Sequence, residues 1–129
     1  MPSEKRKLGD ICETIAVKHL VKHTYTIIGR NYQKKWGEID IIATSVSRDT
    51  NKLHFIEVKG AKVRLDINVR PEVNMSDFKK KRLWRAIQSW FIDNPTYNEI
   101  DWQIDVAAVL LFPERKTVRI RWIRNIIIE

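Results

Sequence analysis

Two apolar segments of the chain carry charged side chains in positions where a buried strand normally has none. They read GEIDII and, one polar stretch later, LHFIEVK, and their β-branched and aromatic residues predict two strands. Side chains alternate across a strand, so Glu38 and Asp40 share one face of the first strand. Glu57 and Lys59 share one face of the second strand in the same way. A fold that accepts both segments therefore places three acids and a lysine beside its hydrophobic core.

The two strands are expected to pair as an antiparallel hairpin. One register sets Ile42 opposite Phe55. The same register sets Asp40 opposite Glu57, with their Cβ atoms roughly 5 Å apart. A shift by two residues keeps the face and changes the partners, whereas a shift by one residue separates the charged groups. The pattern thus leaves the register open, but it favours a shared face for the acids.

Two carboxylates at close range repel each other, and burying them costs several kcal/mol each unless something compensates. Lys59 offsets one charge, and a divalent cation would offset the rest. Mg²⁺ takes oxygen ligands and lowers the pKa of a bound water, which suits hydrolysis of a phosphodiester. The alternative is a solvated Glu-x-Lys surface pair, which contributes little. The second acidic segment in equally apolar surroundings favours the metal site.

Composition and charge narrow the class of protein. The chain has 129 residues, of which 43% are hydrophobic and 31% charged, and this suits one compact domain spanning residues 1–129. Its formal net charge of +8 favours polyanions such as nucleic acid, because neutralising phosphates releases counterions. An anionic membrane surface, an acidic protein partner or simple solubility would account for the same charge.

Cysteine content and hydropathy indicate the compartment. Cys12 is the single cysteine, which excludes an internal disulfide and a zinc–thiolate cluster and suits a reducing environment. The basic start, MPSEKRKLGDI, is not followed by an apolar segment of a signal peptide. The longest apolar run, residues 106–112, is too short to span a bilayer. We therefore expect a cytoplasmic protein with no membrane span.

Hydrophobic periodicity predicts an α/β fold in which helices flank a mixed sheet. The polar stretch 44–52 is expected to be a loop, and residues 60–75 a loop that is mobile. The remaining elements follow the order α-β-β-β-α-β-β, with helices at 8–22 and 76–93 and strands at 25–30, 36–43, 53–59, 102–112 and 117–124. Asp105 interrupts an apolar strand, and we interpret it as a structural residue that bonds a neighbouring loop. Trp90 and Trp122 are expected in the core.

These segments resemble the YraN-like family of uncharacterised bacterial proteins, a branch of the PD-(D/E)xK nuclease superfamily similar to archaeal Holliday-junction resolvases. The resemblance runs through LGDICETIAVKHL, YTIIGRNYQKKWGEIDIIA, LHFIEVK, the lysine-rich helix and QIDVAAV. It implies a restriction-endonuclease-like αβββαβ core that uses Mg²⁺ or Mn²⁺ to hydrolyse phosphodiester bonds of DNA, including branched DNA. It also implies a homodimer, because resolvases cut two strands with two sites. A nucleic-acid-binding protein that keeps the fold without catalysis is the alternative.

The resemblance also assigns roles to single residues. Asp40 matches the first metal-binding acid, Glu57 the second and Lys59 the catalytic lysine. Glu13 matches the acid of the first helix, which makes it a third candidate metal ligand and a candidate catalytic residue. Glu38, the acid that precedes Asp40 in the GEID motif, is a further candidate catalytic residue. For Glu13, an ordinary hydrogen bond at the boundary of the helix is an equal alternative.

Basic residues near the motif are candidates for contacts with DNA phosphates. The family usually has an arginine where this chain has Ala61, and the following GAKV segment shifts such a contact to Lys62 or Arg64. The helix at 76–93 carries a basic face, composed of Lys79, Lys80, Lys81, Arg82 and Arg85. That face is predicted to contact phosphates, and a solvated amphipathic surface is the alternative.

Overall fold

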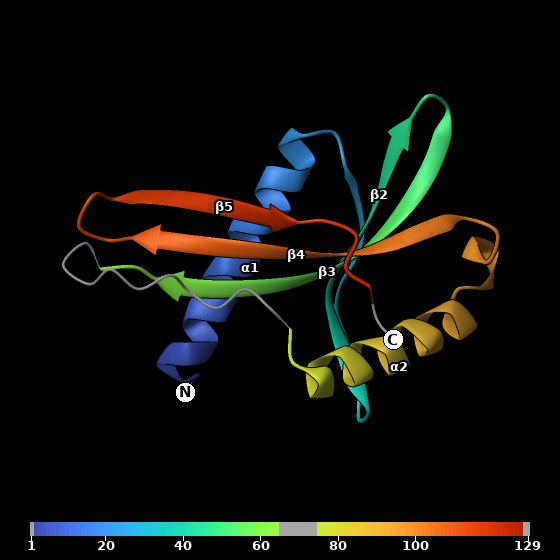
Figure 1. Ribbon diagram of the computed structural model, residues 1–129, viewed down its shortest axis with the longest axis horizontal. Coiled ribbons are helices and arrows are strands. Elements are labelled where there is room, and N and C mark those ends of the chain that lie inside the picture. Colours follow the sequence, from blue (N-terminus) through green and yellow to red (C-terminus); the bar gives the residue numbers. More distant parts are fainter. Residues whose placement is uncertain (1, 65–74, 128–129) are drawn as a thin grey trace.

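A mixed five-stranded sheet between two helices forms the architecture (Figure 1), in agreement with the expected restriction-endonuclease-like α/β core. The computed structural model describes residues 2–64 and 75–127. Its elements in chain order are α1 (Glu4–Lys22), β1 (Thr26–Lys34), β2 (Gly37–Ser47), β3 (Thr50–Lys62), α2 (Asp77–Asp93), the 3₁₀ helix η1 (Pro95–Tyr97), β4 (Asp101–Phe112) and β5 (Thr117–Ile123). The strands lie in the order β1-β2-β3-β4-β5, and only the β3–β4 pair is parallel.

Serine side chains set the start of both α-helices. Ser76 accepts a hydrogen bond from the backbone N–H of Lys79 at 3.2 Å, so the second helix begins where the sequence predicted. The first helix begins at Glu4, four residues earlier than expected, because Ser3 caps it by accepting from the N–H of Arg6 at 3.1 Å. The apolar periodicity starts only at Leu8, which explains the difference.

The prediction of a loop at residues 44–52 was wrong. Strand β2 continues to Ser47 and β3 begins at Thr50, and the hairpin ladder closes with Ser47 opposite Thr50. Arg48 and Asp49 form the two-residue turn, both with positive φ of 51° and 64°, as a twisted hairpin requires. The extra strand residues are polar because this end of the hairpin projects beyond the core (Figure 1).

The predicted loop at residues 60–75 also begins too early. Strand β3 continues to Lys62, since it stays paired with β4 up to Lys62 opposite Leu111. The mobility predicted for the middle of this segment falls on residues 65–74, which lie outside the described residues.

Two hydrophobic clusters cover the two faces of the sheet. Phe55 and Trp90 centre the cluster under α2, with their ring centroids 5.4 Å apart and close to perpendicular. Ile56 and Ala16 lie in the other cluster, under α1. Trp90 is buried as predicted, whereas Trp122 is half-buried at the edge of the α1 cluster. Covering both faces explains why β3 is apolar on both sides for most of its length.

Strands β2 and β3 separate at the end of their shared ladder. The register sets Ile42 opposite Phe55, and the last pair is Ile41 opposite Ile56. Beyond it, β2 turns towards α2, where Gly37 lies so close to the Arg82 carbonyl that a Cβ would overlap it. Strand β3 instead continues along β4 towards α1 (Figure 1). The GEID and EVK motifs therefore flank a gap between two strands.

Among the described residues, no helix is both long and apolar enough to cross a membrane.

Candidate metal centre

Asp40 and Glu57 meet where the two strands separate. The ladder ends one residue short of them, so they meet through their side chains, whose carboxyl groups share a hydrogen bond. Asp40 Oδ2 also accepts the backbone N–H of Val58 at 2.8 Å. This N–H belongs to a residue beyond the last pair of β2 and β3, and the carboxylate satisfies it in place of a strand carbonyl. This hydrogen bond thus satisfies the N–H of Val58 where the two strands separate, and it fixes the orientation of Asp40.

Burial dominates the electrostatics of this pair. Burial raises the pKa of Asp40 to about 6, and the charges of Glu13 and Glu38 act in the same direction. Burial and the charge of Asp40 raise the pKa of Glu57 to about 8, although Lys79 opposes the shift. The hydrogen bond between the two groups lowers the pKa of Asp40 and raises that of Glu57, as expected when Glu57 holds the proton that the pair shares.

Glu13 faces the sheet from α1, with only 7% of its surface exposed. Its Oε1 accepts a hydrogen bond from Arg30 Nε of β1 at 3.2 Å, which is also an ion pair. The ordinary hydrogen bond predicted for Glu13 is confirmed, and the side chain is near enough to Asp40 to raise the pKa of that carboxyl group. Its role as a site acid stays a prediction.

Glu38 is exposed and lies near Glu57, at a cavity beside α2. The two acids line a cavity of about 120 Å³ together with residues of α2, namely Phe78, Lys79, Arg82 and Leu83. Of these, Lys79 contacts the centre most directly, because its Nζ lies 3.9 Å from Glu57 Oε1.

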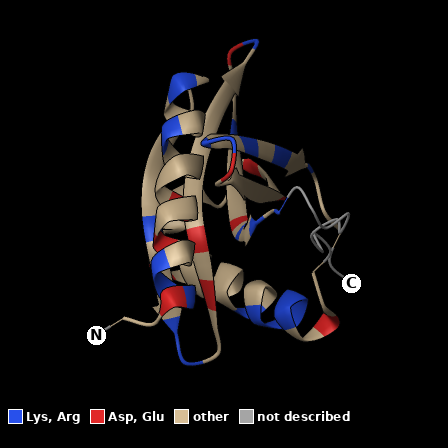
Figure 2. Cartoon of the chain, turned by 90° about the vertical axis from the view of Figure 1, so that its left-hand side faces the viewer, with Lys and Arg blue, Asp and Glu red and all other residues tan. Residues whose placement is uncertain are grey.

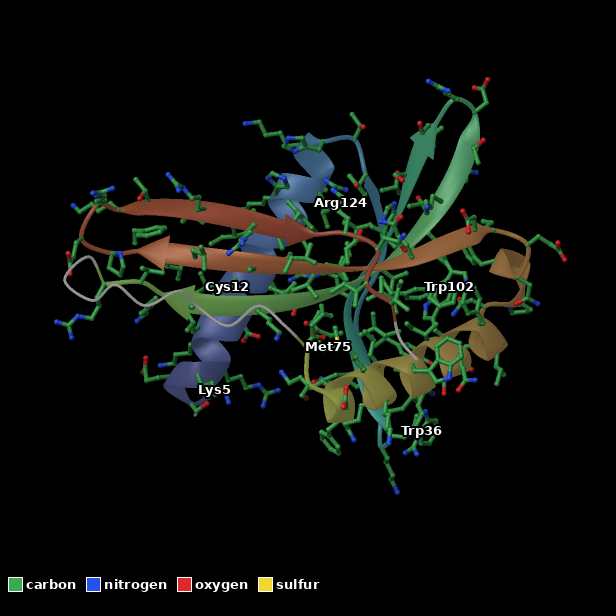
Figure 3. All side chains as sticks on the ribbon, viewed as in Figure 1. Lys5, Cys12, Trp36, Met75, Trp102 and Arg124 are labelled. Atoms are coloured by element: carbon green, nitrogen blue, oxygen red, sulfur yellow. The ribbon has the colours of Figure 1, made fainter. Side chains whose placement is uncertain are left out.

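Lys59 is half-buried and lines a second cavity, of about 380 Å³, beside α1. Lys5 and Lys79 contribute two more ammonium groups to the same cavity. Gly60 lets the strand approach the helix here, since a Cβ at this position would overlap the Cys12 sulfur. Figure 2 shows the acidic residues of the strands between the two helices, and Figure 3 shows Lys5 at the start of α1. Glu57 lines the first cavity, and Lys79 lines both.

The predicted phosphate-binding residues divide into two groups. Lys79 and Arg82 line the cavity that contains Glu57, whereas the half-buried Lys80 lines neither cavity. Lys62 and Arg64 are exposed at and beyond the end of β3, past Gly60, and line neither cavity.

The comparisons with known proteins agree with the resemblance seen in the sequence. The model of the family described as "Uncharacterised protein family UPF0102" matches residues 12–109, which include both strand motifs and Glu13. This chain belongs to the UPF0102 family. It is similar to a UPF0102 protein of Campylobacter hominis, with 34% identity over 109 residues that cover 84% of this chain and 88% of the relative.

Two other relatives extend the comparison over most of the UPF0102 chain. A UPF0102 protein of Aliivibrio fischeri strain MJ11 is 32% identical over 127 residues, covering 97% of this chain and 94% of its own. A UPF0102 protein of Caldanaerobacter subterraneus subsp. tengcongensis is 31% identical over 114 residues, or 88% of each chain. The similarity therefore covers the whole sheet rather than the acidic motifs alone.

A second polar network of this UPF0102 chain is centred on Asp105, and the sequence predicted only part of it. Asp105 Oδ1 accepts the backbone N–H of Asn125 at 2.9 Å, which confirms its predicted bond to a neighbouring loop. Its Oδ2 contacts His54 Nδ1 at 2.9 Å, and His54 Nε2 contacts Ser45 Oγ at 2.7 Å. Sequence reasoning missed His54 because a single histidine in an apolar strand reveals no partner.

Arg30, the partner of Glu13, was missed for the same reason. Its strand, β1, carries no charged motif, and the two residues lie 17 positions apart. Only the packing of α1 across β1 and β2 brings the guanidinium to the acid.

Proposed function

We propose that this UPF0102 protein is a nuclease that hydrolyses phosphodiester bonds of DNA with the help of a divalent cation. The observation that carries the proposal is the hydrogen-bonded pair of Asp40 and Glu57 at the gap between β2 and β3. Lys79 of α2 lies 3.9 Å from Glu57, and it shares a cavity with lysines of α1 and β3. The PD-(D/E)xK pattern that the sequence resembles has the same residue types in the same order, which supports the assignment.

The donor set of the pair fits Mg²⁺ or Mn²⁺. Asp40 and Glu57 would hold the ion, and they offer only oxygen atoms, the ligands that hard cations take. Across the described residues, no three His, Cys, Asp or Glu side chains form a group suited to a metal. Zn²⁺ sites use at least three protein ligands, whereas Mg²⁺ needs only one or two carboxylates besides water and phosphate oxygens. A bound ion would activate a water and neutralise charge on the phosphoryl group.

Three groups of the chain prepare this centre for the reaction. The N–H of Val58 holds one oxygen of Asp40 and so orients the carboxylate. Lys59 follows Glu57 on the same face of β3, where its ammonium group can stabilise the charge that develops on the phosphate. Lys79 reduces the negative potential at Glu57 and so eases the approach of a phosphate.

The substrate is assigned from charge and from the resemblance. Lys5, Lys59 and Lys79 in one cavity and Arg82 in the other supply cations to two cavities that meet at Lys79, the lysine beside Glu57. These positions suit the phosphates that flank a cleavage point. The choice of DNA, the preference for branched DNA and a homodimer that cuts two strands rest on the likeness to resolvases, and they are part of the proposal.

The direct test is cleavage of defined DNA substrates. Linear duplex, single-stranded and four-way-junction DNA are incubated with the protein in Mg²⁺, Mn²⁺ or EDTA. We expect cleavage with either metal, none in EDTA, and a loss of about 10²-fold or more in Asp40→Asn, Glu57→Gln and Lys59→Ala. Asp49→Asn is the matched control, because Asp49 is an exposed acid in the turn at the other end of the β2–β3 hairpin.

Two outcomes would contradict the proposal. Salt-sensitive DNA binding without cleavage in any metal would favour the non-catalytic binding protein. Cleavage that survives Glu57→Gln would indicate a contaminating nuclease. Sedimentation of the protein with and without junction DNA tests the dimer separately.

A further inference from the structure

Phe78 is an exposed aromatic residue in the wall of the candidate site. It is the second residue of α2, and 70% of its surface is exposed. Single exposed apolar residues are common and need no explanation by themselves. Phe78 differs in its position, since it lines the same cavity as Glu57 and Glu38. An exposed aromatic ring therefore lies beside the proposed cleavage centre.

Arg82 makes this ring part of a cationic platform. Its guanidinium carbon lies 5.8 Å from the centroid of the Phe78 ring, one helical turn further along α2. Arg82 Nη1 also donates to the Lys35 carbonyl at 3.4 Å, which ties the turn before β2 to the helix. Below them, Leu83 is buried and fixes this end of α2 to the sheet. The platform is therefore held on a rigid element.

Trp36, an exposed aromatic residue in the turn before β2, is arranged differently from Phe78. Trp36 donates its indole N–H to Ser89 Oγ at 2.7 Å, so its ring is held against α2 (Figure 3). Phe78 has no polar atom to be bound in this way, and most of its side chain stays exposed beside the Arg82 guanidinium.

The two cavities that share Lys79 differ in kind. The cavity beside α1 contains three lysines, Lys5, Lys59 and Lys79, and no aromatic residue. The cavity beside α2 combines an aromatic ring with a guanidinium group. A nucleic-acid strand crossing the carboxylates thus meets point charges on one side, which suit phosphates, and a flat surface on the other, which suits a base.

We propose that Phe78 and Arg82 stack on an unpaired base of the nucleotide next to the phosphate at Glu57. This inference rests on the proposed function and names its substrate class: DNA with an unpaired nucleotide at the cleavage point, as in a flap, a bulge or a branch. In a continuous duplex the base is covered by its neighbours, and the ring meets only the backbone. An unpaired base has a free face, and one stacking contact changes affinity roughly tenfold.

Fluorescence of 2-aminopurine tests the stacking directly. The probe replaces the unpaired base next to the branch point of a flap substrate, and the protein is added in Ca²⁺, an oxygen-seeking cation. We expect quenching by the native protein and by Phe78→Trp, and none by Phe78→Ala. We also expect Phe78→Ala to weaken flap binding roughly tenfold and to leave duplex binding unchanged. Ile92→Ala, which removes another exposed side chain of α2, is the control and should change neither.

Each result bears on the inference or on the proposed function separately. Quenching that persists in Phe78→Ala, or an equal loss of affinity for flap and duplex, would overturn the stacking role. Unchanged thermal unfolding of Phe78→Ala shows that the variant is folded. Quenching that depends on Phe78 in a protein that cleaves no substrate would support the base-stacking role and refute the nuclease. Cleavage with no preference for unpaired nucleotides would support the nuclease and refute the base-stacking role.

Discussion

Replacing Asp40 by Asn should stabilise the metal-free protein at alkaline pH and abolish its response to Mg²⁺. Asn has nearly the same shape, and its carbonyl oxygen can still accept the N–H of Val58 that Asp40 accepts at 2.8 Å. The substitution removes one of two half-buried negative charges, and it also removes one of the two proposed ligands. Stability and metal binding should therefore change in opposite directions.

The magnitude follows from the pKa of the carboxyl group. Burial raises the pKa of Asp40 from 3.8 to about 6, so the folded state holds the proton to higher pH than the unfolded state. The cost of ionising Asp40 in the folded protein is absent below pH 3.8, grows as pH rises, and is complete above about 6. At about 1.4 kcal/mol per pH unit, this cost reaches about 3 kcal/mol. Glu57, whose pKa burial raises to about 8, adds to the repulsion above that pH.

Thermal unfolding followed by circular dichroism measures both effects. At pH 9 in EDTA, we expect Asp40→Asn to unfold several degrees above the native protein, and at pH 4 we expect equal stability. Mg²⁺ at 100 times its dissociation constant should stabilise the native protein by about 2.7 kcal/mol and the variant not at all. Asp101→Asn, at an exposed ion pair with Lys52, should change neither value. A variant that is less stable than the native protein at pH 9, or that gains equally from Mg²⁺, would refute the reasoning.

Three further predictions concern the scaffold and the surface. Gly37→Ala should lower stability by about 1–3 kcal/mol in urea unfolding, because the new Cβ overlaps the Arg82 carbonyl; unchanged stability would contradict that close approach. Asp105→Ala should lower the free energy of unfolding by about 1–3 kcal/mol for each buried group that loses its hydrogen-bond partner, such as His54. Cleavage per folded molecule should stay unchanged. A selective loss of cleavage would instead make Asp105 a site residue. DNA affinity should fall steeply with salt, and Lys79→Ala should reduce the slope of log affinity against log salt by about 1. An unchanged slope would remove Lys79 from the phosphate contacts.

The sequence predicted the sheet because its core strands carry strong patterns. The hydrophobic residues of GEIDII and LHFIEVK predicted two paired strands and left their register open, and the hairpin sets Ile42 opposite Phe55. The acids of the same segments predicted a shared face for Asp40 and Glu57, and the two side chains do meet. They meet at a gap rather than in a ladder. The ladder of β2 with β3 begins only at Ile41, because the preceding residues of β2 lie against α2 instead. A local pattern gives no sign of such a divergence.

Other features depended on contacts that a local pattern does not encode. Residues 44–52 were read as a loop because their polar side chains give no core signal, although cross-strand pairing extends the hairpin through them. The partner of Glu13 on β1 and the partners of His54 on β2 and β4 depend on contacts between separate elements. The role inferred for Phe78 depends on the cavity beside Glu57, which exists only once α2 packs against the strands.

Whether Asp40 and Glu57 bind a divalent cation is tested most directly by anomalous scattering from a crystal grown with Mn²⁺, because this measurement locates the ion without any assumption about activity. The account predicts one strong peak within coordination distance of carboxylate oxygens of both Asp40 and Glu57, and its loss in Glu57→Gln. A peak held by other residues, or none at this pair in an ordered crystal, would contradict it.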